Sequence, residues 1–146
     1  MEEIALATAK EAFAEIGRPI IVEDGGLFIP SLNGFPGAYS AWAMKKIGNG
    51  GVLKLVAGKD RKACFKACVA YCDENGARAF CGEAHGEIAG NERGKTGFGY
   101  DPIFIPTGEK QTFAESETIK NRVSHRFNAF TAFAKWYCKY CLKAPI

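Results

Sequence analysis

The 146-residue sequence lacks any long hydrophobic run. A membrane-spanning helix needs about 18 consecutive apolar residues, and no stretch of the sequence approaches that length. Its first residues, MEEIALATAKEAF, are acidic and helical in pattern, unlike the basic start and apolar core of a secretory signal peptide. Internal repeats and low-complexity tracts are absent as well. We therefore expect one cytoplasmic domain, residues 1–146, that does not interact with a membrane.

Two common nucleotide-binding signatures are also missing. The chain has no GxxxxGK[ST] and no GxGxxG that follows a strand, which argues against a P-loop and a Rossmann fold. The six cysteines include a single CxxC pair, Cys138 and Cys141, whereas a structural zinc site usually takes ligands from two such pairs. Period-two spacing places Cys64, Cys68 and Cys72 on one strand face. We expect the cysteines to be small buried hydrophobic side chains in a reducing cell, rather than zinc ligands or disulfides.

The net charge is only +3, but the charged residues are unevenly distributed along the sequence. Residues 1–90 carry 10 Lys and Arg against 11 Asp and Glu, whereas residues 91–146 carry 9 against 5. A basic C-terminal third suits an anionic ligand. The excess is too small to indicate nucleic acid, and we expect no such partner, although a salt-sensitive nucleic-acid-binding module remains the alternative.

Apolar periodicity predicts an α/β domain with an antiparallel hairpin in its sheet. The expected helices cover residues 2–16, 41–48 and 51–58, followed by an amphipathic C-terminal helix marked by Phe130, Phe133, Ala134, Tyr137 and Cys141. The expected strands cover residues 19–22, 62–72, 77–88 and 103–106. Gly17 should end the first helix, Asn49 should cap the third, and the strand at 19–22 should be buried on both faces.

Two adjacent carboxylates, Glu23 and Asp24, follow the strand at 19–22, the kind of strand end at which α/β proteins place ligands. Consecutive side chains of a continuing strand point to opposite faces. One of the two can therefore bind Mg²⁺ or orient a water while the other makes structural hydrogen bonds. A solvated strand end before a glycine turn is the alternative.

The stretch KTGFGYDPIFIP, residues 95–106, surrounds a phenylalanine with two glycines. The glycines allow the backbone to approach a flat ring closely, and Phe98 and Tyr100 offer faces on which a base can stack. Asp101 can accept a hydrogen bond or position a cation. An ordinary turn leading into a strand is the alternative.

A basic corner is predicted where the last helix begins. Ser124 is expected to cap that helix, which puts His125 and Arg126 in its first turn, where cations oppose the helix dipole. This unfavourable placement indicates a bound phosphate or carbonyl group, with Lys120 just upstream as a further donor. A basic surface face is the alternative.

Four segments, VEDGGLFIPSLNGFPGAYS, GFGYDPIF, FAE and KNRVSHR, resemble in order and spacing the inosine/xanthosine triphosphate pyrophosphatase family, over residues 2–136. The resemblance implies an elongated α/β fold in which flanking helices and a central mixed sheet form two lobes around a nucleotide cleft, usually as a homodimer. It also implies Mg²⁺-dependent hydrolysis of non-standard purine nucleoside triphosphates (ITP, dITP, XTP) to the monophosphate and pyrophosphate. A catalytically impaired nucleotide-binding protein on the same scaffold is the alternative.

The resemblance assigns roles to individual positions. Asp24 matches the carboxylate that binds Mg²⁺ and activates water, and Gly25 stands where the family usually has a hydroxyl side chain. His125 and Arg126 match the pair that contacts the 6-oxo group of the purine, where adenine has an amino donor and is rejected. The other residues that match nucleotide-binding positions are Phe98, Gly99, Tyr100, Asp101 and Lys120.

The match begins inside the second helix of the family. The T/S-G-N-x-x-K phosphate-binding segment and the glutamate that shares the metal therefore have no counterpart among these 146 residues. We expect an unpaired sheet edge at that place, and an unpaired edge favours self-association.

Overall fold

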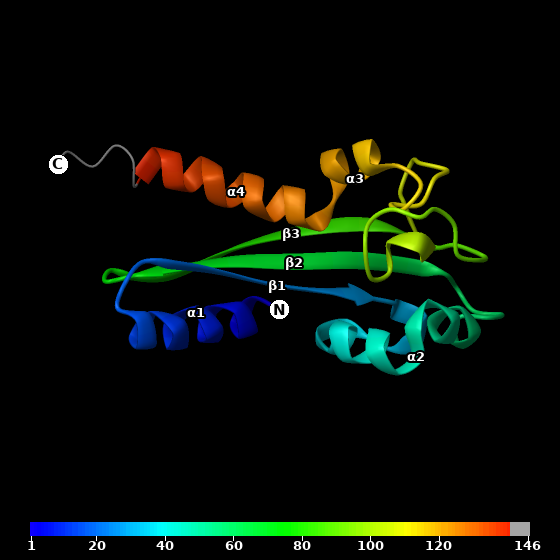
Figure 1. Cartoon of the computed structure of the whole chain (residues 1–146), viewed down its shortest axis with the longest axis horizontal. Helices are drawn as coiled ribbons and strands as arrows, with labels where there is room; N and C mark the ends of the chain where they lie inside the picture. The colour runs from blue at the N-terminus through cyan, green and yellow to red at the C-terminus, as the bar shows by residue number, and fades with distance from the viewer. Residues whose placement is uncertain (141–146) are drawn as a thin grey trace.

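The sheet at the centre of the structure has helices on both faces (Figure 1), as the α/β assignment predicts. The structure, a computed structural model, describes residues 1–140. In chain order its elements are α1 (Glu2–Ile16), β1 (Ile20–Phe28), α2 (Ser40–Leu55), β2 (Lys62–Asp73), β3 (Gly76–Ile88), β4 (Phe104–Pro106), α3 (Glu117–Val123) and α4 (His125–Tyr140). Within this range, no helix combines the length and the apolar character needed to span a bilayer.

The strands lie in the order β1-β2-β3-β4, and every neighbouring pair is antiparallel. The expected hairpin of β2 and β3 is confirmed, with Asp73 opposite Gly76 at the turn. Two residues can join these strands only in an antiparallel sense, and β4 then folds back on β3. The four described strands therefore form no parallel pair, which differs from the mixed sheet that was expected.

β1 is longer and more exposed than the sequence predicts. The expected end of this strand at residue 22 is wrong, because its pairing with β2 continues as far as Phe28. The absence of a side chain at Gly26 permits this, since a methyl group there would overlap the carbonyl of Gly37. The strand is not buried on both faces either, because Ile21 is 44% exposed.

Alternate residues of β2 pack against different helices. One face contacts α1 through a cluster that contains Ala5, Ala9, Cys68, Ala70 and Cys72. The opposite face contacts α4 through a cluster that contains Ala67, Val69, Tyr71, Ala129 and Phe133. Figure 1 shows the same arrangement, with α1 and α4 on opposite sides of the strands. A third cluster, around Leu27, Phe65, Phe104 and Phe113, fills the end of the sheet near α2.

The two short helices expected at 41–48 and 51–58 are present as the two parts of α2. The helix breaks at Gly48, whose φ of 58° and ψ of −170° are not helical. The predicted cap by Asn49 is wrong, because its side-chain oxygen has no hydrogen-bond partner among the described residues. Its amide nitrogen instead donates to the carbonyl of Gly99 at 3.2 Å, which ties α2 to residues 95–101, the aromatic loop.

The expectation of free, buried thiols holds only in part. Cys68 and Cys72 do share the face of β2 that packs on α1, as predicted, but Cys68 forms a disulfide with Cys81. The antiparallel register places these two residues directly opposite each other on β2 and β3, a relation that spacing within one strand does not reveal. Cys64 and Cys72 are free and buried, Cys138 is free and exposed, and Cys141 lies outside the described residues.

We predict that Gly82→Ala destabilises the fold. A methyl group at Gly82 would overlap the backbone of His125 and Ala129, because β3 and the first turn of α4 touch there without an intervening side chain. Overpacking of this kind should lower the free energy of unfolding by about 1–3 kcal/mol in urea denaturation. Gly90→Ala is the control, since a methyl group there meets nothing within 4 Å. This substitution should change the free energy of unfolding by less than about 0.5 kcal/mol. Equal effects of the two substitutions would contradict the close approach.

Candidate functional site

A cavity of about 320 Å³ lies where α2, the aromatic loop and the start of α4 meet beside β1. This volume is within the range of about 300–1,000 Å³ that is usual for small-molecule sites. Most of the predicted site residues line it, namely Gly25, Phe98, Gly99, Tyr100, Asp101, His125 and Arg126. The fold therefore brings together residues that lie up to about 100 positions apart in the sequence, and a cavity lies where the cleft was expected.

The buried carboxylate of Asp101 holds the aromatic loop in shape. Its Oδ2 atom accepts a hydrogen bond from the backbone N–H of Phe98 at 2.7 Å and pairs with Nζ of Lys120 at 2.6 Å. Asp101 is only 3% exposed, so the ion pair is largely shielded from water. Gly97 has a φ of 74°, and a methyl group on it would overlap the same carboxylate. Asp101 thus fixes the loop and orients Lys120.

The two aromatic residues of the loop differ in exposure. Phe98 is 61% exposed, and its ring lies open beside the cavity. Tyr100 is buried in the core, and its hydroxyl donates a hydrogen bond to the carbonyl of Ser40 at 2.8 Å. Burial raises the pKa of this hydroxyl to about 12. Phe98 is therefore the residue that offers a free stacking face, whereas Tyr100 forms part of the wall.

Two cations of the predicted basic corner lie over the ring of Phe98. Nζ of Lys120 is 4.2 Å from the ring centroid, and the guanidinium of Arg126 is 5.0 Å from it. Lys120 does not line the cavity itself, but it is bonded to Asp101, which does. Nε of Arg126 pairs with Oε1 of Glu23 at 2.9 Å, so this arginine also connects α4 to β1.

His125 is buried at the first turn of α4, and Ser124 caps this helix as predicted by accepting the N–H of Phe127. Its imidazole stacks on Phe65, with ring centroids 4.5 Å apart and planes 7° apart. Burial, and then the charges of Arg126 and Lys120, lower its pKa from 6.5 to about 3. The ring is therefore neutral at ordinary pH, and its Nδ1 has no hydrogen-bond partner in residues 1–140. A ligand in the cavity can supply that partner.

Asp24 is placed apart from the other predicted site residues. It lies opposite Cys68 in the β1–β2 register, and side-chain alternation puts it on the face of the sheet that carries α1. Glu23 and Gly25 point to the other face, where Glu23 meets Arg126 and Gly25 lines the cavity. The two carboxylates do point to opposite faces, as expected, but the one on the cavity side is Glu23.

Several contributors to the cavity come from α2 and β2 and carry no motif. Met44 and Lys45 line it from α2, and Phe65 lines it from β2 beneath His125. Lys45 adds a third cation to the two near Phe98. Spacing along the chain could not reveal these residues, because only the packing of α2 against the loop brings them to the site.

Comparison with known proteins identifies close relatives. The model of the Ham1 family matches residues 1–136. A dITP/XTP pyrophosphatase of Methanopyrus kandleri is 52% identical over 140 residues, which are 94% of this chain and 74% of that protein. One of Hyperthermus butylicus is 46% identical, over 96% and 75%. The solved structure of a HAM1 protein from Coxiella burnetii superposes with a TM-score of 0.86 at 33% identity, over 94% of this chain and 76% of that one.

We predict that His125 makes the folded chain sensitive to acid. Between pH 6.5 and about 3, the unfolded chain protonates this histidine whereas the folded chain does not, so stability should fall as the pH falls through that range. His125→Phe keeps an aromatic ring on Phe65 but removes the titration. The urea midpoint of the variant should therefore change less between pH 7 and pH 4 than that of the wild type, and an unchanged pH dependence would contradict this account.

Proposed function

The chain belongs to the Ham1 family, and from this membership and the geometry of the cavity we propose that it hydrolyses non-standard purine nucleoside triphosphates such as dITP, XTP and ITP. The products are the nucleoside monophosphate and pyrophosphate. The observation that carries the proposal is the buried, neutral His125 beside Arg126 in the wall of a cavity that an exposed aromatic ring also borders.

The cavity is suited to a 6-oxo purine. The exposed ring of Phe98 can stack on the base, while the neutral imidazole of His125 and the guanidinium of Arg126 can donate hydrogen bonds to an oxygen. Adenine presents an amino donor at that position, and the arginine has no acceptor to offer it. Adenine would leave the buried imidazole and the neighbouring guanidinium without an acceptor, which would account for rejection of the common nucleotide.

The triphosphate would lie toward the cations. Lys120 lies against Phe98, and Lys45 lines the same cavity from α2, whereas Arg126 is assigned to the base. The two lysines attract a polyanion, and the charge of Lys120 is partly balanced by Asp101 when no substrate is bound. Binding the phosphates therefore exchanges an intramolecular ion pair for contacts to the ligand.

Magnesium is proposed as the cofactor, with Asp24 as its main protein ligand. Among the described residues the carboxylate of Asp24 forms no hydrogen bond or ion pair, so its oxygens are available to a cation, and Mg²⁺ is usually held by one or two carboxylates together with phosphates. When bound, Mg²⁺ would neutralise phosphate charge and lower the pKa of a coordinated water. The predicted role of Asp24 is to orient the attacking water and accept its proton.

The position of Asp24 favours one alternative, a protein that binds these nucleotides without hydrolysing them. Asp24 lies on the opposite face of the sheet from Gly25 and the cavity, so base recognition does not depend on it. Pyrophosphate release from dITP in the presence of Mg²⁺ separates the two functions. Binding of dITP without release would support the alternative. The homodimer and the cytoplasmic location stay predictions.

Asp24→Asn should abolish pyrophosphate release while leaving IMP binding within about twofold of wild type. An amide is a weaker ligand for Mg²⁺ and cannot accept the proton of a water at neutral pH. Asp60→Asn is the matched control, because Asp60 is an exposed aspartate outside the cavity lining. Release at the wild-type rate by the Asp24 variant would remove this residue from its role.

Arg126→Ala should weaken binding of IMP but not of AMP. The lost interaction is a charge-assisted hydrogen bond to the 6-oxo group, worth about 1.5–3 kcal/mol, and AMP has no acceptor there. Phe98→Ala should instead weaken both nucleotides by similar factors, since stacking is nearly indifferent to the substituent at C6.

Isothermal titration calorimetry with the monophosphates measures both effects without requiring turnover. Arg122→Ala is the control for the arginine, because Arg122 pairs with Glu109 on the surface and does not line the cavity. If the Arg126 variant loses equal affinity for IMP and AMP, this arginine serves the phosphate or the fold and not the base.

A further inference from the structure

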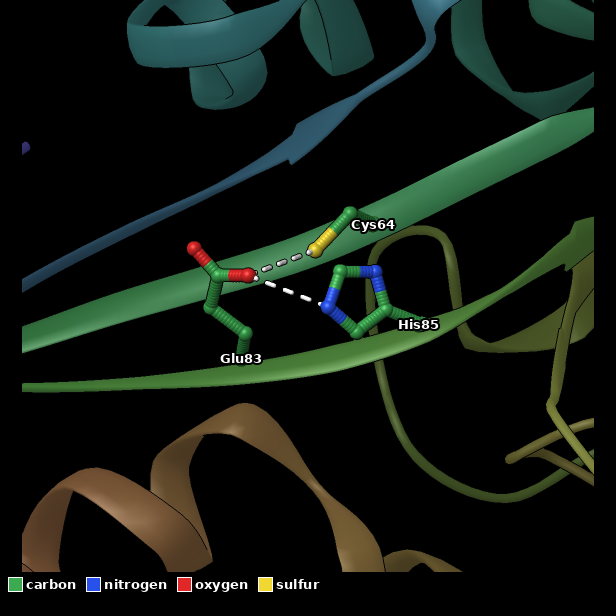
Figure 2. Close-up of side chains that lie close together, drawn as sticks. All are labelled: Cys64, Glu83 and His85. Carbon is green, nitrogen blue, oxygen red and sulfur yellow. Dashed lines mark hydrogen bonds and ion pairs between the residues drawn. The ribbon is translucent and has the colours of Figure 1, made fainter.

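Three potential metal ligands converge on the face of the sheet that is opposite the nucleotide cavity. Cys64 projects from β2, and Glu83 and His85 project from β3 on the same side (Figure 2). The register explains this, because Cys64 lies directly opposite His85 and Glu83 is two residues from His85 on the same strand face. Phe65, the next residue after Cys64, points the other way and lines the nucleotide cavity.

One carboxylate oxygen connects the other two side chains. Oε2 of Glu83 lies 3.7 Å from Sγ of Cys64 and 3.2 Å from Nε2 of His85, and the three ligand atoms all lie within 4.8 Å of one another. Bond lengths to Zn²⁺ of about 2.3 Å from sulfur and about 2.0–2.2 Å from nitrogen or oxygen place tetrahedral ligand atoms about 3.4–3.6 Å apart. The observed separations therefore fit a single ion with only small side-chain movements.

The surroundings provide both access and orientation. Cys64, Lys66 and His85 line a surface hollow of about 550 Å³, and His85 has 71% of its side chain exposed. Nζ of Lys66 binds the other oxygen of Glu83, Oε1, at 2.7 Å. Lys66 thereby holds the carboxylate in place and leaves Oε2 turned toward the thiol and the imidazole, as outer partners of metal ligands commonly do.

We propose that Cys64, Glu83 and His85 form a Zn²⁺ site on the outer face of the β2–β3 hairpin. A thiolate, an imidazole and a carboxylate are the ligand types that zinc takes, and the sulfur ligand disfavours Mg²⁺, which requires oxygen. The zinc ligands share this face with Asp24, the proposed Mg²⁺ ligand, but they come from β2 and β3 rather than from β1. Three protein ligands leave a fourth position for water or another ligand.

Without a metal, Cys64 is a neutral thiol. Burial, followed by the charge of Glu83, raises its pKa to about 11. A bound Zn²⁺ would displace this proton and stabilise the thiolate. The earlier expectation that the cysteines bind no zinc rested on the single CxxC pair, and it did not consider ligands that the register assembles across two strands.

Binding of Zn²⁺ and Co²⁺ to the whole chain tests the site. Equilibrium dialysis should find one bound zinc per chain in wild type. Cys64→Ser should reduce the zinc affinity at least about tenfold, because the loss of even an outer partner of a metal ligand lowers metal affinity about 10–100-fold. Co²⁺ should produce a thiolate charge-transfer absorption in wild type and none in Cys64→Ser. His85→Gln should also weaken zinc binding at least about tenfold while retaining some thiolate absorption with Co²⁺.

Two control variants remove other thiols: Cys72→Ser the buried one on the same strand face, and Cys138→Ser the exposed one on α4. Each should keep the zinc affinity and the cobalt absorption of wild type. Thermal unfolding with and without Zn²⁺ provides a second measurement, because an ion bound to the native state raises the midpoint in wild type but not in Cys64→Ser. The proposal would be overturned if wild type bound no stoichiometric zinc. It would also be overturned if a control variant lost the zinc while Cys64→Ser kept it.

Discussion

Every residue of β2 has to place its side chain on one of two faces, and for most of the strand both faces are covered. Ala67, Val69 and Tyr71 pack on α4, whereas Cys68, Ala70 and Cys72 pack on α1. This alternation fixes the register of β1 and β3, because a shift by one residue would exchange the two sets. It also decides that Phe65 lies under His125 while its neighbour Cys64 lies on the other side of the sheet.

The shape of the cavity depends on a second buried interaction, which is electrostatic. The carboxylate of Asp101 binds one backbone N–H of the loop and the ammonium of Lys120, and each of these contacts is shorter than 3 Å. If the aspartate were lost, the loop would lose its closing hydrogen bond and Lys120 would be left partly buried without a partner. The open ring of Phe98 and the two cations above it are thus positioned by a residue that is itself almost inaccessible to ligand.

The features that the sequence predicts correctly are local ones. The range of α1, the cap at Ser124, the β2–β3 hairpin and the break that divides α2 all depend on residues within a few positions of each other. The motifs that border the cavity are also short segments, and their identity is visible before the fold is known. Here pattern and structure agree because the same few residues determine both.

The features that sequence reasoning missed depend on pairings between distant segments. Tyr100 was expected to stack on a base, but its hydroxyl bonds to Ser40, 60 residues away, and its ring is buried. Glu23 and Asp24 were expected on opposite faces, but only the register of β1 with β2 decides that Glu23 is the one on the cavity side. The disulfide at Cys68 and the cluster at Cys64 likewise arise from the register of β2 with β3.

The contact at Gly82 has a consequence for how the protein tolerates change. Because the backbone of β3 touches the backbone of α4 at His125 and Ala129, only glycine fits at this position of the strand. The height of the imidazole above Phe65 is therefore tied to this backbone contact more than to the rotamers of the surrounding core. The core can be repacked around the contact as long as position 82 keeps no side chain.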